Sequence, residues 1–256
     1  MGETVGTPEL IWILLLGLIS GLMIGCIGIG GVILVPAAVF LVGIPIQIAI
    51  AAAMFAYIMA GIVGTVVFAR HKSIRWEMAL WLCIGATPTA FAGAWAVSIA
   101  NPRVLEAFLG ALAFLSGLNA LRTQNALETK ERNVSNGALL IVGAITGFLS
   151  SVSGTGGPLV LVPIVISMGV PVLIAVGLSQ VIQLPVAVAA TAGNILYGEL
   201  DLVLGGALAF SLTVGSWFGA KLAHTVPRAT LRRIVSIVLV VVGAFILGNV
   251  IWRLAR

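Results

Sequence analysis

The sequence predicts an all-α integral membrane protein with two homologous, inverted repeats, each a broken, re-entrant first helix followed by three transmembrane helices. Three observations support this fold class: the composition, the lengths of the apolar segments and an internal repeat. Of the 256 residues, 61% are hydrophobic and only 8% are charged, which is too little charge to cover a soluble protein. Lipid must therefore be the main solvent, and helices satisfy their own backbone groups there.

Eight apolar segments are separated by short polar connections. They cover residues 10–43, 45–69, 76–99, 104–121, 136–169, 171–196, 202–222 and 230–252. Most are close to the roughly 20 residues that a helix needs to cross a hydrocarbon core, whereas a lipid-facing barrel would show shorter, alternating segments. A hydrophilic linker at residues 122–135 separates a first membrane repeat, residues 1–121, from a second, residues 136–256.

An offset of 126 positions aligns the glycines and prolines of the two halves. The aligned pairs include Gly17/Gly143, Gly21/Gly147, Gly31/Gly157, Gly43/Gly169, Pro45/Pro171, Thr65/Thr191 and Gly93/Gly219. One register that holds over most of each half is the signature of a duplicated unit. Duplicated membrane halves with broken helices are a recurrent architecture of transporters.

The first segment of each half is too long for one crossing. Residues 10–43 would make a helix of about 51 Å at about 1.5 Å per residue, against a hydrocarbon core of about 30 Å. Glycine-rich stretches at residues 25–31 and 150–157 interrupt these segments, and glycine readily leaves the helical conformation. We therefore expect a break and a return to the same side in each half. The alternative is one long tilted helix with close-packing glycines.

The charges of the connections favour opposite orientations for the two halves. The connection at residues 70–75 is basic, whereas its counterpart at residues 198–201 is acidic; the connection at residues 221–233 is again basic. If basic connections stay in the cytoplasm, the halves are inverted and both termini lie outside. Arg253 and Arg256 argue against that placement of the C-terminus, and a simple model with eight crossings remains an alternative.

The breaks are candidate binding sites for an anion. A helix that starts after Gly31 or Gly157 presents unpaired N–H groups and a partial positive charge, which attract an anion without a basic side chain. A serine hydroxyl there can instead bond back to its own helix. The candidate substrate-binding residues are Gly28, Gly30, Gly31, Ser151, Ser153, Gly154, Thr155, Gly156, Gly157, Gln180, Gln183 and Asn194.

A polar stripe runs along the sixth apolar segment. Gln180, Gln183, Thr191 and Asn194 fall within an arc of roughly 80° on a helix, so this face should point into the protein. The stripe either lines the path of a solute or holds helices together. The equivalent stripe of the first half, with Tyr57 at its start, is less polar, which predicts an asymmetric site.

Several classes of function lack their motifs in this sequence. No Asp or Glu lies deep in an apolar segment, so the usual intramembrane proton relay is missing. No His-Glu-x-x-His, nucleotide-binding glycine loop or paired-carboxylate motif occurs, and we expect no enzymatic activity, no cofactor and no metal. The net charge of +5 comes from clusters in the connections, which predicts no nucleic-acid partner.

The glycine-rich segments resemble those of the sulfite exporter family TauE/SafE. The similarity rests on Gly21-Leu-Met-Ile-Gly-Cys-Ile-Gly-Ile-Gly-Gly31 followed by Pro36, and on Gly147-Phe-Leu-Ser-Ser-Val-Ser-Gly-Thr-Gly-Gly157 followed by Pro163. It covers nearly the whole chain, although Pro163 lies one residue later than Pro36 relative to its glycines. The resemblance implies a multi-pass permease of the cytoplasmic (inner) membrane that moves sulfite, sulfoacetate or related sulfur-containing anions, usually outward.

Taken together, the expected function is transport of a small sulfur-containing anion that binds at the helix breaks near the membrane midplane. The expected partners are the anion and the lipid bilayer, and a homo-oligomer is compatible with the sequence. One alternative is passive, channel-like flux of the anion. Another is a membrane protein that transfers thiol or sulfane sulfur through Cys26, although a thiol in an apolar segment usually acts as a small hydrophobe. A third is a structural partner of another complex.

Overall fold

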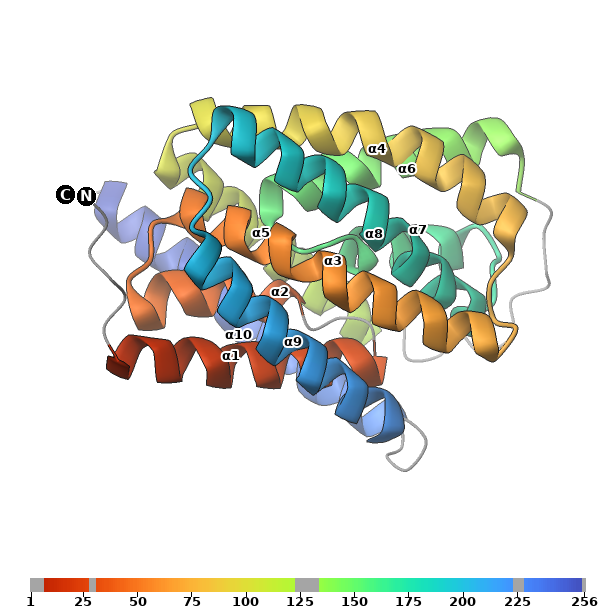
Figure 1. Ribbon diagram of the computed structural model, residues 1–256, viewed down its shortest axis with the longest axis horizontal. Coiled ribbons are helices and arrows are strands. Elements are labelled where there is room, and N and C mark those ends of the chain that lie inside the picture. Colours follow the sequence, from red (N-terminus) through yellow and green to blue (C-terminus); the bar gives the residue numbers. More distant parts are fainter. Residues whose placement is uncertain (1–6, 28–30, 123–133, 223–227, 255–256) are drawn as a thin grey trace.

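The computed structural model describes residues 7–27, 31–122, 134–222 and 228–254 (Figure 1). Helices account for nearly all of these residues, and no strand occurs among them. The all-α fold class is therefore confirmed. The candidate residues Gly28 and Gly30 and most of the linker lie outside the described residues.

Each half contains the same order of elements. The first half has α1 (Thr7–Ile27), α2 (Gly31–Ala37), which continues as the π-helical turn η1 (Ala38–Val42), α3 (Ile46–Arg70), α4 (Trp76–Ile99) and α5 (Pro102–Arg122). The second half has α6 (Asn136–Ser153), α7 (Pro158–Ser167), α8 (Val172–Tyr197), α9 (Leu202–Leu222) and α10 (Arg228–Leu254). The bounds lie close to the apolar segments that the sequence predicts.

The matched Gly-x-Pro sequences make matched turns. Gly43 and Gly169 end the first segment of their halves with φ of 83° and 89°, a left-handed conformation that glycine adopts without steric cost. Pro45 and Pro171 then precede α3 and α8 with nearly the same backbone angles, ψ being 137° and 141°. These local sequences therefore start the two central helices in the same way.

Several helices are suited to a membrane by length and composition. Within the described ranges, five are long and apolar enough to cross it: Ile46–Arg70, Trp76–Ile99, Asn136–Ser153, Leu173–Tyr197 and Leu202–Gly219. The outer surface carries large apolar side chains, among them Ile99 and Phe210, which are 66% and 70% exposed. Such a surface is costly in water and suits lipid, so the chain is a multi-pass membrane protein.

Helices α3 and α8 pack on each other at the centre of the bundle, and α4 and α9 flank them. Outside this core, α1 packs along α9, α6 packs along α4, and α5 pairs with α10. Glycines permit the close approach: a Cβ on Gly21 would collide with the carbonyl oxygen of Leu212, and one on Gly147 would collide with that of Ala86. Because Leu212 is the counterpart of Ala86 at the offset of 126, the two halves make equivalent contacts.

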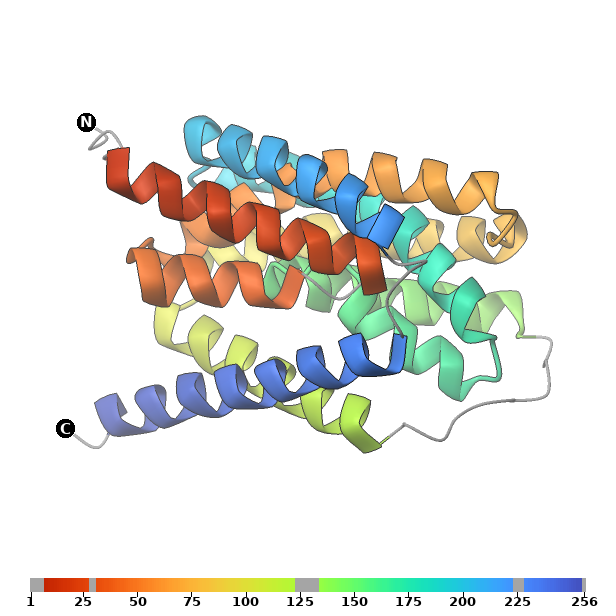
Figure 2. The same cartoon turned by 90° about the horizontal axis from the view of Figure 1, so that it is seen from below.

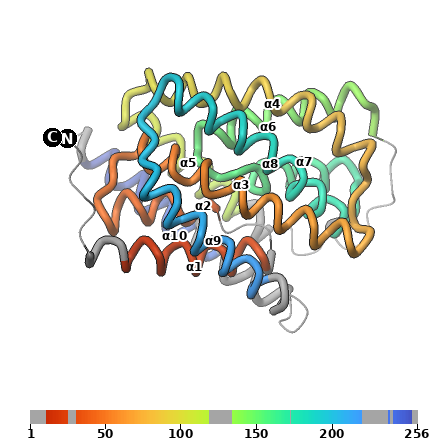
Figure 3. Tube along the Cα trace, in the orientation of Figure 1, coloured from red at the N-terminus to blue at the C-terminus, as the bar shows by residue number. Residues whose placement is uncertain are grey.

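Equivalent helices run in opposite directions along the bundle (Figures 1 and 2). Helices α1 and α3 both begin at one end, the left in Figure 1, whereas α6 and α8 both begin at the other. The first segment of each half therefore returns to the end where it started. The connection between α3 and α4 lies at the end opposite to the connection between α8 and α9 (Figure 3).

The two limbs of each first segment are unequal in length. Helix α1 has 21 residues and α6 has 18, whereas the returning limbs have 7 + 5 = 12 residues in α2 with η1 and 10 residues in α7. The sequence predicted two half-helices in each case. The returning limb is the shorter one in each half because few residues lie between the break and the glycine that ends the segment, Gly43 or Gly169.

The sidedness of the connections in the membrane stays a prediction. Lys72 and Glu199 are both exposed and lie in the connections at opposite ends of the bundle. In a Cys26→Ala, Cys83→Ala background, we expect an impermeant thiol reagent to reach Lys72→Cys only from the cytoplasmic face and Glu199→Cys only from the other face. Labelling of both cysteines from one face would contradict the inverted topology.

Candidate functional site

The second half contains a helix break built from three glycines. Helix α6 ends at Ser153, and Gly154, Gly156 and Gly157 adopt φ of 67°, 77° and 116° before α7 begins. Side chains with a Cβ rarely adopt these angles, so glycine makes the break possible. The predicted interruption of residues 136–169 is therefore confirmed.

Backbone donors remain unpaired at this break. The N–H groups of Gly154 and Thr155 donate to the carbonyl oxygen of Ser150, but those of Gly156 and Gly157 have no acceptor among the described residues. Pro158 occupies the first position of α7 and has no N–H to donate. Two backbone donors without an acceptor thus directly precede the positive end of the α7 dipole.

Tyr57 of α3 connects this break to the first half. Its fully buried hydroxyl donates a hydrogen bond of 3.0 Å to the carbonyl oxygen of Gly31, the first residue of α2. Its ring lies against Gly156, where a Cβ would be only 3.0 Å from Cδ2. A Cβ on Gly31 would also lie 2.6 Å from the carbonyl oxygen of Thr155. The start of α2 and the second break are therefore in direct contact.

The sequence pattern predicts no contact for Tyr57, which begins the less polar stripe of the first half. A signal for it exists, because Tyr57 is the counterpart of Gln183 at the offset of 126. Helices α3 and α8 therefore carry a polar side chain at equivalent positions of the two halves. The residue before Gln183, Ile182, lies beside the break, since its Cγ2 would be 3.5 Å from a Cβ on Gly157.

The four hydroxyls of the break divide into two groups. Ser153 donates to the carbonyl oxygen of Leu149 at 2.7 Å and lies 2.9 Å from the hydroxyl of Thr155. These two hydroxyls therefore hold the turn together. The hydroxyls of Ser150 and Ser151 are buried and have no hydrogen-bond partner within the described chain. Of the candidate hydroxyl ligands, Ser151 is thus available and Ser153 and Thr155 are engaged.

The polar stripe of α8 is buried, as its helical spacing predicts. Gln180, Gln183, Thr191 and Asn194 are at most 5% exposed. Gln180 and Asn194 are 14 positions apart, which is about 21 Å along a helix. The carbonyl oxygen of Gln180 accepts a hydrogen bond of 3.1 Å from the hydroxyl of Thr65 of α3. The stripe therefore runs along the centre of the bundle.

Seven buried side-chain atoms have no hydrogen-bond partner within the described chain, and all lie in α6 and α8. They are Thr146 Oγ1, Ser150 Oγ, Ser151 Oγ, Gln180 Nε2, Gln183 Oε1, Thr191 Oγ1 and Asn194 Nδ2. Each unpaired buried group costs about 1–3 kcal/mol, and native proteins keep few of them. Ser150 and Ser151 lie in the last turn of α6 before the break, and unpaired groups beside it are candidate partners for a polar ligand.

No metal centre is visible in the described part of the chain, where no three His, Cys, Asp or Glu residues gather. Cys83 is a free, half-buried cysteine of α4. The side chain of Cys26 lies outside the described residues, as do Gly28 and Gly30. The site thus consists of neutral groups: backbone N–H, hydroxyls and amides.

A substitution at Gly157 separates backbone strain from crowding. A Cβ there has room, with only Ile182 at 3.5 Å, but φ of 116° is unsuited to alanine. We expect Gly157→Ala to distort the break, at a cost of about 1–3 kcal/mol, and to weaken anion binding. Gly206→Ala, whose added methyl group meets nothing within 4 Å, is the control. The measurements are the midpoint of thermal unfolding in detergent and the anion affinity of both variants. If Gly157→Ala keeps the wild-type value of both, the conformation of Gly157 matters neither for stability nor for binding.

Comparison with known proteins places the chain in a family. The family model described as "Sulfite exporter TauE/SafE" matches residues 13–246. "Probable membrane transporter protein YunE" of Bacillus subtilis is 24% identical, over 90% of this chain and 94% of that protein. "Probable membrane transporter protein MJ0441" of Methanocaldococcus jannaschii is 27% identical, over 92% of this chain and 94% of that protein. No solved structure gives a match. The chain described here belongs to the TauE/SafE sulfite exporter family of membrane transporters.

Proposed function

We propose that this transporter moves a small sulfur-containing anion, such as sulfite, sulfoacetate or another organosulfonate, across the cytoplasmic membrane. The anion binds at the break between α6 and α7, beside the polar stripe of α8. The name of the family supports this class of substrate. The unpaired donors at the break between α6 and α7 support binding there.

The unpaired buried groups carry this proposal. Sulfite and sulfonate oxygens are hydrogen-bond acceptors, and the break offers donors: the hydroxyls of Ser150 and Ser151 and the N–H groups of Gly156 and Gly157. The amide of Gln183 carries a donor and an acceptor, and rotation of the amide exchanges them. An oxyanion would satisfy several of these groups at once.

Neutral donors suit a solute that must be released. A buried cation would bind an anion tightly and would itself be costly in an empty membrane site. In contrast, backbone N–H groups and amides supply directional hydrogen bonds and the partial charge of a helix start. The absence of Lys, Arg and His from the described stripe and break therefore fits transport better than storage.

A flux assay tests the substrate class. Purified protein in liposomes should move sulfite or an organosulfonate in preference to sulfate, with a rate that saturates, because a fixed set of donors binds one anion at a time. Sulfite, sulfoacetate, thiosulfate and sulfate are compared at equal concentration, with protein-free liposomes as the background. Rates equal to that background for all four anions would refute the proposal, and a rate that never saturates would indicate a passive channel.

Replacement of Gln183 tests whether the stripe binds the solute. Gln183→Leu should weaken anion binding by about 1–3 kcal/mol, which is about 5- to 150-fold in Kd. Thermal stability should not fall, since Oε1 of Gln183 has no partner to lose.

Thr65→Val is the matched control for Gln183→Leu. It removes the hydrogen bond of 3.1 Å to the carbonyl oxygen of Gln180, and it should lower stability by about 0.5–1.5 kcal/mol with little change in affinity. If Gln183→Leu instead behaves like Thr65→Val, the amide only joins helices and does not bind the anion.

A further inference from the structure

The ring of Tyr57 lies flat against the backbone of Gly156. A Cβ on Gly156 would be 3.0 Å from Cδ2 of the ring and 3.3 Å from Cε2 and from Cγ, the two neighbours of Cδ2. These nearly equal distances place the Cβ position over the face of the ring, because a point beyond the ring edge would be much farther from both neighbours. The aromatic ring therefore covers one side of Gly156.

The hydroxyl group of Tyr57 fixes the position of this ring. It donates a hydrogen bond of 3.0 Å to the carbonyl oxygen of Gly31, and the whole side chain is buried. A Cβ on Gly31 would be only 2.8 Å from the hydroxyl oxygen, so glycine at this position allows the approach. Tyr57 is thus held at its hydroxyl end by α2, while its ring face meets the second break.

The first glycine of the break also rests on the first half. A Cβ on Gly154 would be 2.7 Å from Cγ2 of Val35 in α2 and 3.2 Å from Cγ1 of Ile50 in α3. Ile50 and Tyr57 are seven positions apart, which places them two turns apart on the same face of α3. Gly157, in contrast, meets only Ile182 of α8, at 3.5 Å. One face of α3 therefore supports the break at Gly154 and Gly156.

Tyr57 has no group left that would bind an anion directly. Its hydroxyl hydrogen is donated to Gly31, and the face of an aromatic ring carries partial negative charge. The ring instead contacts Gly156, whose N–H has no acceptor among the described residues. Glycine adopts many backbone conformations, so a neighbour is needed to keep Gly156 at φ of 77°. The contacts of Tyr57 suit this task.

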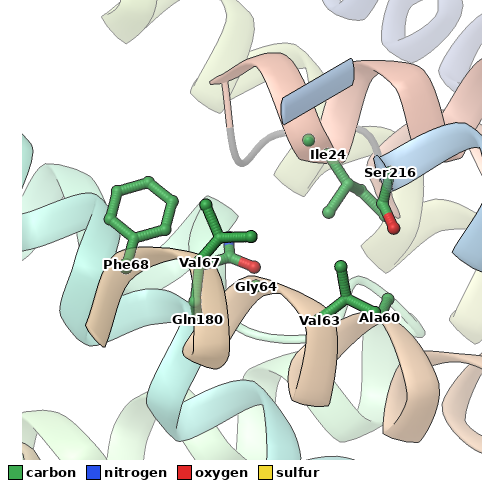
Figure 4. Close-up of a pocket in the computed structure, with 9 residues that line it drawn as sticks. Ile24, Ala60, Val63, Gly64, Val67, Phe68, Gln180 and Ser216 are labelled. Atoms are coloured by element: carbon green, nitrogen blue, oxygen red, sulfur yellow. The ribbon is translucent and has the colours of Figure 1, made fainter. Parts of the chain in front are cut away.

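A small pocket lies farther along α3 (Figure 4). It is lined by residues of four helices, among them Ala60 and Gly64 of α3, Gln180 of α8 and Ser216 of α9. The pocket has room for about one water molecule, which is too little for sulfite or sulfoacetate. The break is therefore the place where a side chain of α3 can affect the binding of such an anion.

We propose that Tyr57 is a positioning residue for anion binding: its ring holds Gly156 in the conformation in which the N–H groups of Gly156 and Gly157 bind the anion, and its hydroxyl holds the ring through Gly31. This inference rests on the proposed function. Without the ring, the glycines adopt many conformations, and the apparent affinity falls in proportion to the fraction that can still bind. At saturating concentration the anion selects the competent conformation, so the maximal rate is preserved.

Two substitutions of Tyr57 separate the ring from the hydroxyl. Tyr57→Leu removes the ring face and should raise the KM for sulfite and sulfoacetate flux into liposomes at least about tenfold, with the maximal rate within about twofold of wild type. Tyr57→Phe keeps the ring and loses the hydrogen bond to Gly31. It should lower the midpoint of thermal unfolding but keep KM within about threefold of wild type.

Leu208→Ala is the matched control for Tyr57→Leu. Leu208 is a buried residue of α9 in the same apolar core, where it faces Gly17. The change should lower thermal stability without a change in KM, because the cavity lies away from the break. If Tyr57→Leu also loses only stability, the ring merely fills the core and the proposal is wrong. A KM of Tyr57→Phe as high as that of Tyr57→Leu would assign the effect to the hydroxyl and overturn the role of the ring.

Fluorine NMR supplies a measurement that leaves the ring in place. The chain contains only two tyrosines, Tyr57 and Tyr197, so protein labelled with 3-fluorotyrosine gives signals that Tyr197→Phe assigns. The anion that is transported, sulfite or sulfoacetate, should shift the signal of Tyr57, because a negative charge then lies beside Gly156. The signal of Tyr197, which is 51% exposed and packs on Phe91 at the end of α8, should stay unchanged.

The outcomes distinguish this inference from the proposed function. Wild-type protein that moves neither anion would refute the proposed function. Wild-type transport combined with an unshifted Tyr57 signal at a saturating anion concentration, or with equal shifts of the Tyr57 and Tyr197 signals, would refute only the positioning role of Tyr57.

Discussion

The need to satisfy backbone hydrogen bonds away from water governs the whole structure. A continuous helix meets this need within its own segment, but a break does not. The break at Gly154–Gly157 is therefore buried between α2, α3 and α8, where Tyr57 reaches the carbonyl oxygen of Gly31. Helices α3 and α8, which pack on each other at the centre of the bundle, enclose the break together with α2.

The two halves share their backbone contacts and differ in polar side chains. Glycines at equivalent positions bring equivalent helices together, as at Gly21 and Gly147. At the centre, however, Tyr57 stands where the second half has Gln183, and Met54 stands where it has Gln180. The tyrosine is hydrogen-bonded and the methionine is apolar, whereas both glutamines carry unpaired atoms. The two halves thus share a scaffold and differ in the polar side chains that they place at its centre.

Unpaired polar groups in the second half explain how binding and stability are related in this protein. Each such group lowers the stability of the empty protein, and an anion that pairs with it returns that energy as affinity. Under the proposed function, neutral donors bind an anion and let it leave, which a single buried charge would not do.

The sequence by itself determined the elements of this protein and the positions where they end. Chain length in lipid, helical spacing and the backbone freedom of glycine are local properties, so the central helices, the turns at Gly43 and Gly169, the second break and the buried face with Gln183 were all predictable. Only the tertiary structure decided which hydroxyls are engaged, as in Ser153, and which are unpaired, as in Ser151. It also decided the link from Tyr57 to Gly31 and the pocket at Gln180. These features depend on contacts between helices that are distant in the sequence, and a local sequence pattern does not specify such contacts.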